Sequence, residues 1–326
     1  MLRSLGLVAV VTGTAVAWCG AREDTPTAPP AVAAKPAAAV STMEYITVDS
    51  KALDAKIRVG IYLPAAYASR PDAKFPCLYF LHGMFGDERK WQQRETDLVL
   101  DELIEKGEVP PMIVACPAGH NSMYVNWVNG QGRWMDFITV DLVNALESKY
   151  RIDGRREMRG ISGDSMGGYG ALNIAMQKPE LYGSASAHSA ALFPADPAQV
   201  NPRLKRWAKQ WGEVFGDPID LKFWQQNNPI HRASTIDAKA LDGLALYFDC
   251  GERDEFGFDK TCSLLHDTLE KSKIPHTYEL RGGDHGATYF RDNVGHSLRF
   301  HGVTFTGATG DATKAGGKSG GAKKDG

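Results

Sequence analysis

Apolar and polar positions in residues 43–300 repeat with two periods, one typical of strands and one of helices. Period-two alternation and short apolar runs predict strands at Tyr45–Val48, Lys56–Leu63, Cys77–Leu81, Met112–Cys116, Met158–Ser162, Ser184–His188, Leu244–Asp249 and Thr277–Leu280. Apolar positions three and four apart predict helices at Thr96–Lys106, Trp134–Lys149, Met166–Gln177, Asp259–Ser272 and about Gly286–Phe300. A hairpin followed by strand–helix repeats indicates an α/β fold: a mostly parallel eight-stranded sheet with helices on both faces.

The first 21 residues have a different pattern, that of a targeting segment. The apolar run Leu5–Ala17 is too short to span a bilayer as a stable helix, and Ala15–Ala17 has the small-x-small form of a signal-peptidase site. We therefore expect a signal peptide over residues 1–21 and an exported protein. Cys19 offers a second route, lipid attachment after cleavage, although Trp18 is larger than the residue that normally precedes a lipidated cysteine. A cytosolic protein with an apolar leader is the alternative.

Three other segments depart from the strand–helix pattern. Residues 22–42 form a Pro/Ala-rich linker, and residues 306–326 form a Gly/Lys-rich tail with nothing to bury, which we interpret as disordered. The folded domain is expected over residues 43–305. Within it, residues 190–240 carry large aromatic residues among Pro, Asp and Asn, which favours a cap-like insertion over the carboxyl edge of the sheet.

Composition and charge narrow the class of protein. The chain has 326 residues, of which 43% are hydrophobic and 23% charged, as in globular proteins. The formal net charge of −2 supplies no positive field that would gather phosphates, so nucleic acid is not an expected partner.

The most informative motif is G-x-S-x-G at Gly163–Gly167, between a predicted strand and a predicted helix. In this context the motif indicates a nucleophile elbow, a turn so tight that side chains at the two glycine positions would clash. The turn exposes the hydroxyl of Ser165, and the helix N-terminus favours negative charge that develops there. A plain glycine-rich strand–helix turn is the alternative.

A serine nucleophile needs a histidine base and a carboxylate, which in this fold follow it in the order Ser, Asp/Glu, His. Asp254 follows the strand Leu244–Asp249 and is the expected acid, with Glu252 and Asp249 as rivals. His285, in a glycine-flanked loop after the next strand, is the expected base. His296 and His301 fall in or after the last helix and are the weaker candidates.

The reaction also needs two backbone N–H groups for the oxyanion. Met166 follows the nucleophile and provides one. The loop Leu81–Gly86 ends an early strand and contains two glycines, so the N–H of Met84 is the expected second donor.

These motifs resemble the esterase family of α/β-hydrolases that holds feruloyl esterases, esterase D (S-formylglutathione hydrolase), enterochelin esterase and the mycobacterial mycolyltransferases. The resemblance spans Tyr45 to about Phe300 and rests on Arg58–Pro64 with Tyr67, Phe75–Gly83, Gly163–Tyr169, Gly251–Asp254 and Gly282–His285. It implies the α/β-hydrolase fold, the triad Ser165, Asp254 and His285, and the oxyanion donors Met84 and Met166.

The order and spacing of the motifs look most like the secreted feruloyl and carbohydrate esterase branch. Two residues depart from the family pattern. Asp164 stands where that branch often has a small or apolar residue, and His82 stands where mycolyltransferases have aspartate. The second departure weakens an acyltransferase interpretation.

The predicted activity is that of a secreted serine carboxylic-ester hydrolase acting through an acyl-enzyme on an acylated carbohydrate or a similar ester. An acyltransferase of the mycolyltransferase type with the same triad is the alternative, and a non-catalytic cell-wall or carbohydrate binding module is a third. No cofactor is implied. No two histidines lie four residues apart beside a glutamate and no cysteine pairs have zinc-finger spacing, so we expect no metal site.

Three further residues are candidates for binding the substrate. Trp127 and Trp134 are candidates for stacking on a sugar ring, although large aromatic residues are as often core residues. His82 is a candidate for the pocket, with hydrogen bonding of its own loop as the alternative. Residues 121–132 and the insertion are expected to wall the pocket. Among the cysteines, Cys250 and Cys262 are the plausible disulfide pair.

Overall fold

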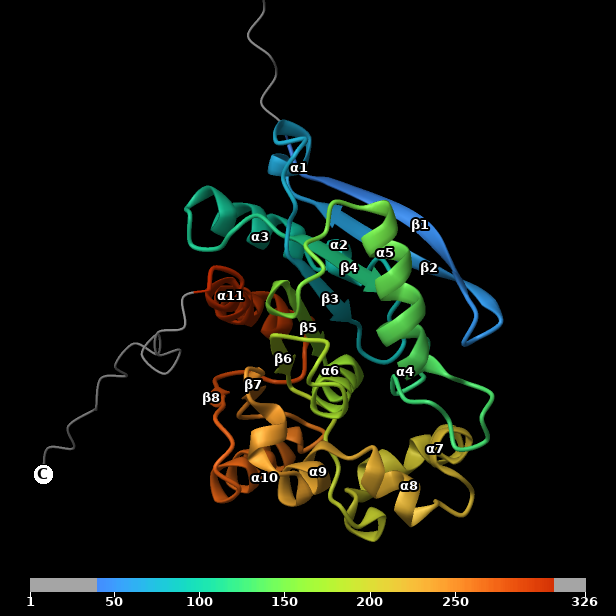
Figure 1. The fold of residues 1–326 in the computed structure, drawn as a ribbon. Coiled ribbons are helices and arrows are strands. Elements are labelled where there is room, and N and C mark those ends of the chain that lie inside the picture. Colours follow the sequence, from blue (N-terminus) through green and yellow to red (C-terminus); the bar gives the residue numbers. More distant parts are fainter. Residues whose placement is uncertain (1–39, 308–326) are drawn as a thin grey trace, which may run out of the picture. The chain divides into compact units, whose positions relative to one another are not determined.

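Eight strands form one sheet in the order β1-β2-β4-β3-β5-β6-β7-β8 (Figure 1). The strands are β1 (Thr42–Ser50), β2 (Ala55–Leu63), β3 (Cys77–Leu81), β4 (Ile113–Pro117), β5 (Arg159–Asp164), β6 (Ser184–His188), β7 (Ala245–Gly251) and β8 (Thr277–Arg281). β1 and β2 form an antiparallel hairpin, β2 pairs antiparallel with β4, and all other neighbours are parallel. The eight predicted strands and the mostly parallel sheet are confirmed.

The computed structural model of the chain describes residues 40–307, and of residues 205–210 it describes only the backbone. The predicted signal peptide, the lipidation candidate Cys19, almost all of the linker and almost all of the tail lie outside the described residues. Among the helices that the structure describes, none is long and apolar enough to cross a bilayer.

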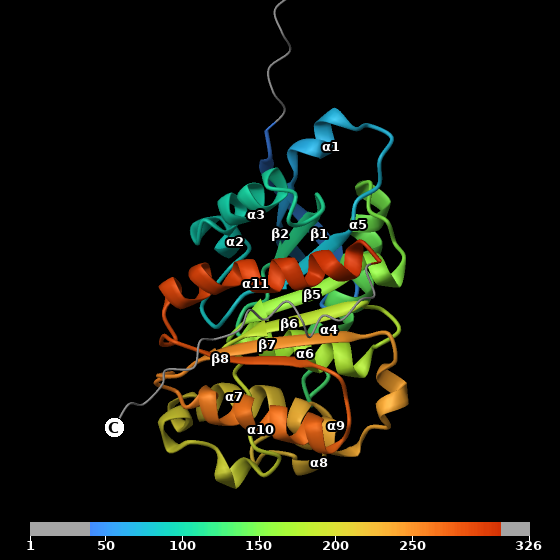
Figure 2. The same ribbon diagram turned by 90° about the vertical axis from the view of Figure 1, so that its left-hand side faces the viewer.

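Helices cover both faces of the sheet. They are α1 (Ala65–Ser69), α2 (Lys90–Gln93), α3 (Thr96–Glu105), α4 (Trp134–Asp136), α5 (Val143–Lys149), α6 (Met166–Gln177), α7 (Ala208–Phe215), α8 (Leu221–Gln226), α9 (Pro229–Thr235), α10 (Phe258–Lys271) and α11 (Ala287–Phe305). Figure 2 shows α11 lying across one face of the sheet beside α3, with α10 on the opposite side. The expected two-faced arrangement is therefore present.

Alternation along the central strands divides the core between the two faces. In β3, Leu78 and Phe80 belong to the apolar cluster formed with α3 and α11. Tyr79 and Leu81 point to the other face, into the larger cluster that includes α5, α6 and α10. Because both faces are buried, the strand is apolar throughout, as parallel strands are.

Two helices differ from the prediction. The single helix predicted over Trp134–Lys149 has a π-helical middle, Phe137–Leu142, which apolar spacing alone does not reveal. The last helix continues to Phe305, and at Gly302 it passes close to Val109 and Pro110, where an added Cβ would lie 3.2 Å from their side chains.

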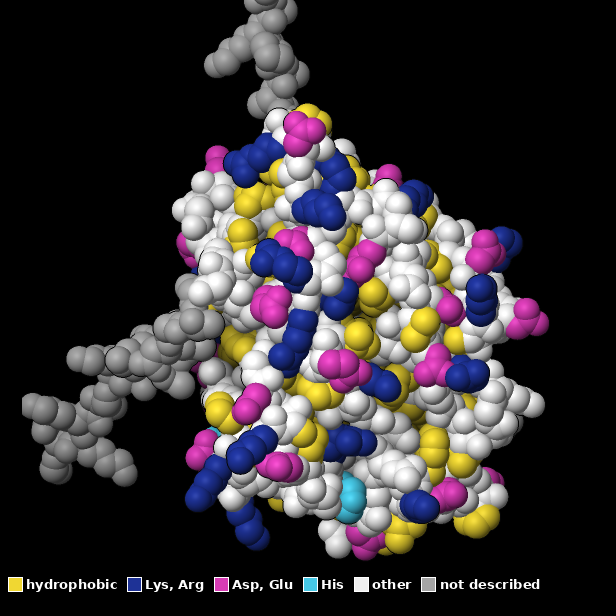
Figure 3. Space-filling view, in the orientation of Figure 1, with side chains coloured by type: hydrophobic (Ala, Val, Ile, Leu, Met, Phe, Trp, Pro, Cys, Tyr) yellow, Lys and Arg dark blue, Asp and Glu magenta, His cyan; other side chains and the backbone are white. Residues whose placement is uncertain are grey.

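Figure 3 shows one face of the molecule, on which basic and acidic side chains are intermixed. This face offers no continuous basic surface of the kind that binds nucleic acid.

Candidate active site

Ser165 lies in the turn between β5 and α6, and its backbone is strained. Its φ of 52° is in the region that non-glycine residues rarely adopt. A Cβ added at Gly163 would lie 2.3 Å from the backbone of Gly167, and one added at Gly167 would lie 1.8 Å from the carbonyl oxygen of Leu81. The steric reason predicted for both glycines is therefore confirmed.

His285 reaches Ser165 from the loop between β8 and α11. Its Nε2 lies 2.8 Å from Ser165 Oγ. The backbone N–H of His285 donates to Glu255 Oε2 at 3.1 Å, and the imidazole packs edge-on against the rings of Phe256 and Phe290. These contacts hold the ring in the orientation that places Nε2 at the serine.

Asp254 lies in the loop that follows β7, and its side chain is inaccessible to solvent. Its Oδ2 lies 2.7 Å from His285 Nδ1. Its Oδ1 accepts the backbone N–H groups of Phe256 at 3.0 Å and Phe258 at 3.4 Å. The Cys250 thiol donates to Oδ2 at 3.7 Å. The carboxylate is therefore fixed from several sides, with one oxygen directed at the histidine.

The two rival acids lie elsewhere. Glu252 is exposed and pairs with its neighbour Arg253. Asp249 is fully buried, and its Oδ2 lies 2.9 Å from His188 Nδ1. His188 Nε2 in turn lies 2.8 Å from Ser297 Oγ, so the molecule contains a second Ser–His–Asp set. All three members of that set are buried and none lines the pocket at Ser165, so its role is structural.

The two rival bases are also outside the site. His301 is buried between Ser184 and Ser186, at 2.7 Å from one hydroxyl and 2.8 Å from the other. Burial lowers the pKa of His301 to about 3, which keeps the ring neutral. His296 lies on the exposed side of α11, where partial burial lowers its pKa.

The candidate oxyanion donors lie on either side of Ser165. Met166 is the first residue of α6, and the N–H groups of a first helical turn have no partner within the helix. Met84 lies in the loop after β3 and lines the same pocket as Ser165. This loop is held in place because Gly86 N–H donates to the Gly83 carbonyl and Phe85 N–H donates to Asn121 Oδ1 at 2.8 Å.

Ser165 and His285 open into a pocket of about 240 Å³. Its lining is mostly apolar and aromatic: Met84, Phe85, Met123, Ala191, Phe193, Leu204, Trp211, Phe256, Phe258, Ala287 and Phe290, together with Gly83, Arg94 and Asp164. Four of these residues come from residues 190–240 and one from residues 121–132.

The three candidate substrate-binding residues do not line this pocket. His82 is buried; its Nδ1 lies 2.7 Å from the Gly83 carbonyl, and its Nε2 accepts the Gly119 N–H at 2.8 Å, so it supports the loop. Burial lowers the pKa of His82, which suits an acceptor nitrogen. Trp127 and Trp134 line a separate hollow of about 160 Å³. Trp207, which does belong to the insertion, lies among the residues whose side chains are not described.

Sequence reasoning missed Arg94, the cationic partner of Asp164. Arg94 Nη1 lies 2.5 Å from Asp164 Oδ2, and both side chains line the pocket beside Ser165. Arg94 follows the short helix α2 and belongs to no motif. The departure at Asp164 was the available signal, since an aspartate buried at this position requires a cation.

Cys250 and Cys262 are buried free thiols. The hydrogen bond that the Cys250 thiol makes with Cys262, together with burial, raises the pKa of Cys250, so it stays protonated. The two residues are adjacent, as the sequence pairing suggested, but they are not joined.

An eight-stranded, mostly parallel sheet with a strained serine at the β5–α6 turn defines an α/β-hydrolase. Comparison with known proteins agrees with this class. The family described as "Putative esterase" matches residues 50–308. The S-formylglutathione hydrolase of Mus musculus is 28% identical over 279 residues, which cover 76% of this chain and 90% of that enzyme.

Two solved structures have the same fold. A ferulic acid esterase matches 82% of this chain and 99% of its own, with a TM-score of 0.70 and 24% identity. The fluorophosphonate-binding serine hydrolase F of Staphylococcus aureus matches 80% of this chain and 98% of its own, with a TM-score of 0.66 and 19% identity. The chain belongs to this esterase family and is a carboxylic ester hydrolase.

Proposed function

We propose that the enzyme is an exported serine esterase in which Ser165 is the nucleophile, His285 the base and Asp254 the acid. The observation that carries this proposal is the continuous chain of contacts from Ser165 Oγ to His285 Nε2, at 2.8 Å, and from His285 Nδ1 to Asp254 Oδ2, at 2.7 Å. This chain opens into a pocket, whereas the buried set of Ser297, His188 and Asp249 does not.

In the acylation step, Ser165 Oγ attacks the ester carbonyl carbon while its proton passes to His285 Nε2. The Asp254 carboxylate accepts the Nδ1–H and stabilises the imidazolium that forms. His285 then gives the proton to the leaving alcohol as the carbon–oxygen bond breaks. Water attacks the resulting acyl-serine, with His285 again as the base, and releases the carboxylic acid and free Ser165.

The N–H groups of Met84 and Met166 are the proposed donors to the oxyanion of each tetrahedral intermediate. The positive end of the α6 dipole adds to this stabilisation. Backbone donors need no reorganisation during the reaction, and the contact of Phe85 with Asn121 supports the Met84 loop.

We further propose that the substrate is an acylated carbohydrate or a similar ester with a compact acyl group. A pocket of about 240 Å³ lined by aromatic and apolar side chains favours a small or flat acyl chain. The hollow lined by Trp127 and Trp134 would receive the sugar of the alcohol part, with the half-buried indole of Trp127 as the stacking surface, since Trp134 is buried. Residues 190–240 would act as the cap that sets acyl preference.

Export is the remaining part of the proposal, and its support is the apolar run Leu5–Ala17, which ends in the small-x-small sequence Ala15–Ala17. Mass analysis of the mature protein from the producing cell tests it. A terminus between Trp18 and Arg22 supports export, and diacylglycerol on Cys19 identifies a lipoprotein. An intact Met1 in the cytosol overturns export.

Active-site labelling tests the catalytic residues. A fluorophosphonate probe is expected to modify the purified enzyme once, on the peptide that contains Ser165, with matching loss of p-nitrophenyl acetate hydrolysis. Ser165→Ala should abolish labelling, while the control Ser297→Ala should label normally, because Ser297 is buried. Labelling that persists in Ser165→Ala would end the serine assignment.

A substrate panel tests the alcohol and acyl parts separately. Values of kcat/KM are compared for acetylated and feruloylated sugars and for S-formylglutathione, the substrate named in the mouse relative. Preference for the thioester would overturn the carbohydrate proposal and leave the triad intact. Added acceptor sugar should not divert product to a new ester; diversion would indicate an acyltransferase.

A further inference from the structure

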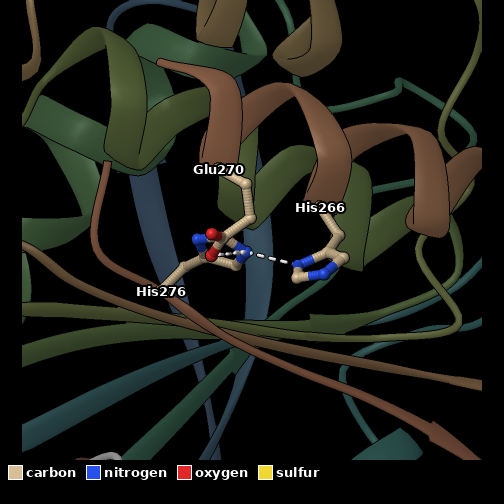
Figure 4. Close-up of side chains that lie close together, drawn as sticks. All are labelled: His266, Glu270 and His276. Atoms are coloured by element: carbon tan, nitrogen blue, oxygen red, sulfur yellow. Dashed lines mark hydrogen bonds and ion pairs between the residues drawn. The ribbon is translucent and has the colours of Figure 1, made fainter. Parts of the chain in front are cut away.

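Three side chains with metal-binding atoms meet at the end of the α10–β8 connection, away from the esterase pocket (Figure 4). His266 and Glu270 lie one turn apart on α10, and His276 immediately precedes β8. Their nearest ligand atoms all lie within 4.8 Å of one another. His266 Nδ1 is 2.8 Å from His276 Nε2, and Glu270 Oε1 is 4.0 Å from the same nitrogen.

His276 is oriented as a metal ligand would be. Its Nδ1–H donates to the Ile274 carbonyl at 2.9 Å, which leaves the lone pair on Nε2, the atom that faces the other two residues. The ring stacks on Phe248 with an interplanar angle of 13°, and its side chain is 1% exposed.

The other two residues complete an open arrangement. The His266 ring is half-buried and packs against Tyr278, with ring centroids 5.0 Å apart. The side chain of Glu270 is 67% exposed, so it is free to rotate and leaves room for water.

We propose that His266 Nδ1, His276 Nε2 and a Glu270 carboxylate oxygen bind one divalent transition-metal ion of the zinc type, with water as a fourth ligand. Two imidazoles and one carboxylate are a donor set that suits Zn²⁺ and not Mg²⁺ or Ca²⁺. Tetrahedral ligands about 2.0–2.1 Å from zinc lie about 3.4 Å from each other. The separations of 2.8 and 4.0 Å lie on either side of this value, so small side-chain rotations would form the site.

Metal binding would take the place of the hydrogen bond between His266 and His276. In the present geometry, His266 Nδ1–H donates to His276 Nε2. On binding, His266 takes the tautomer protonated at Nε2, both rings remain neutral, and no redox step is involved. A motif with both histidines on one helix does not describe this set, which joins His266 and Glu270 to a histidine just before the next strand, so the expectation of no metal site did not cover it.

The proposed ion would fasten the carboxyl end of α10 to the start of β8. The opposite ends of these elements carry the loops of Asp254 and His285. His266 lies eight residues along α10 from Phe258, about 12 Å at the helical rise. We therefore assign the ion a stabilising role and expect kcat to change by less than about twofold on its removal.

The test uses the full-length mature enzyme without a polyhistidine tag, treated with chelator and dialysed. Calorimetric titration with ZnCl₂ is expected to give one site per chain, and zinc should raise Tm. Co²⁺ should give the visible absorption of a four-coordinate ion. Absence of a one-to-one site in the wild type overturns the proposal.

Matched variants locate the site. Glu270→Ala is expected to weaken zinc binding by about tenfold and His266→Ala by about 100-fold, because each variant removes one of the three protein ligands. The controls are Asp267→Ala, an exposed carboxylate on the same helix, and His231→Ala, a half-exposed histidine on α9; both should bind as the wild type does. A zinc affinity of His266→Ala equal to that of the wild type would overturn the proposal. Equal losses of zinc affinity in Glu270→Ala and Asp267→Ala would also overturn it. Glu270 and His266 are accessible, so neither variant depends on replacing the buried His276.

Discussion

Asp164 and Arg94 form an ion pair in the wall of the esterase pocket, with 2.5 Å between Oδ2 and Nη1. The Asp164 side chain is 2% exposed and that of Arg94 16%. Within residues 40–307, Oδ1 of Asp164 has no hydrogen-bond partner, so Arg94 is the main compensation for this charge. The Arg94 guanidinium also lies 4.6 Å from the centre of the Phe290 ring.

The unequal burial of this pair predicts unequal effects of its two truncations. Arg94→Ala leaves an uncompensated buried carboxylate and should lower the free energy of unfolding by about 3–5 kcal/mol. Asp164→Ala leaves an arginine that reaches solvent and stacks on Phe290, so it should cost less. The double variant should be more stable than Arg94→Ala alone. Chemical unfolding of the three proteins measures the coupling, and additive losses would contradict the interpretation.

Arg94→Ala should also reduce turnover. The unpaired charge of Asp164 would then lie beside the position where the oxyanion forms, which disfavours the transition state. Asp164→Ala does not create this charge and should keep more of its kcat on p-nitrophenyl acetate. Values of kcat for the two variants, measured under conditions in which both are folded, check this order.

If Ser165 and His285 act as one unit, their effects on kcat will not add. Ser165→Ala and His285→Ala should each lower kcat by about 10⁶-fold, and the double variant should be scarcely worse, because a base without a nucleophile has nothing to activate. Asp254→Asn should cost about 10⁴-fold, since aspartate orients the imidazole without taking its proton. Circular dichroism should show that the proteins remain folded. Near-normal activity of Asp254→Asn would remove it from the triad.

Asp249, in β7, and Asp254, in the loop after β7, are both buried but predict opposite phenotypes. Asp249 contacts His188 together with the hydroxyls of Tyr247 and Tyr289, all inside the core. Asp249→Asn should therefore lower the free energy of unfolding by about 3 kcal/mol and change kcat by less than about tenfold. Asp254→Asn should instead lower kcat strongly and change the free energy of unfolding less. Unfolding curves and kcat measured on both variants decide the matter, and a large kcat loss with unchanged stability in Asp249→Asn would reassign the acid.

Most of what positions this site could be predicted from local sequence. In a parallel sheet the carboxyl ends of neighbouring strands share one edge, so the loops after β5, β7 and β8 had to place Ser165, Asp254 and His285 near one another. The nearest rivals were resolved only by side-chain direction. Asp249 pairs in register with His188 across β6 and β7 and points away from the pocket. Strand ends predicted from sequence are uncertain by about two residues, so the direction of the Asp249 side chain could not be predicted.

Contacts between segments far apart in the chain could not be predicted from local sequence. Arg94 is 70 residues from Asp164, and nothing in its own surroundings marks it as a partner. His82 is of a residue type common in binding pockets, but its two ring nitrogens form hydrogen bonds with the backbone of Gly83 and Gly119. The set of His266, Glu270 and His276 has no standard spacing, because the third member comes from a different element.

Burial of His301 predicts a dependence of stability on pH. Its pKa falls from 6.5 in the unfolded chain to about 3 in the folded protein, because burial disfavours the charged ring. Between these values the unfolded state binds a proton that the native state does not. Stability is therefore lost as pH falls through 6.5 toward 3, with a contribution of up to about 1.4 kcal/mol per pH unit. His301→Asn should flatten the curve of unfolding free energy against pH by this slope, whereas His231→Asn should not.

The insertion contributes Trp211 to the pocket at Ser165, and this contact predicts a change of specificity. Trp211 packs against Phe193, with ring centroids 5.1 Å apart, and both residues line the pocket. Trp211→Leu keeps the surface apolar but adds space, so kcat/KM should rise about tenfold for p-nitrophenyl esters with longer acyl chains relative to acetate. Hydrolysis of acetate itself should stay within about threefold, because a small acyl group does not fill the pocket.

Phe215→Leu is the matched control for Trp211. Phe215 lies on the same helix, α7, and is equally buried, but it does not line the pocket at Ser165. Both substitutions remove an aromatic ring from the insertion and should lower Tm. Only Trp211→Leu should change the ratio of kcat/KM values for long and short esters. The same shift in both variants would mean that the insertion acts on the site through its general stability, and equal loss on all substrates would make Trp211 a structural residue.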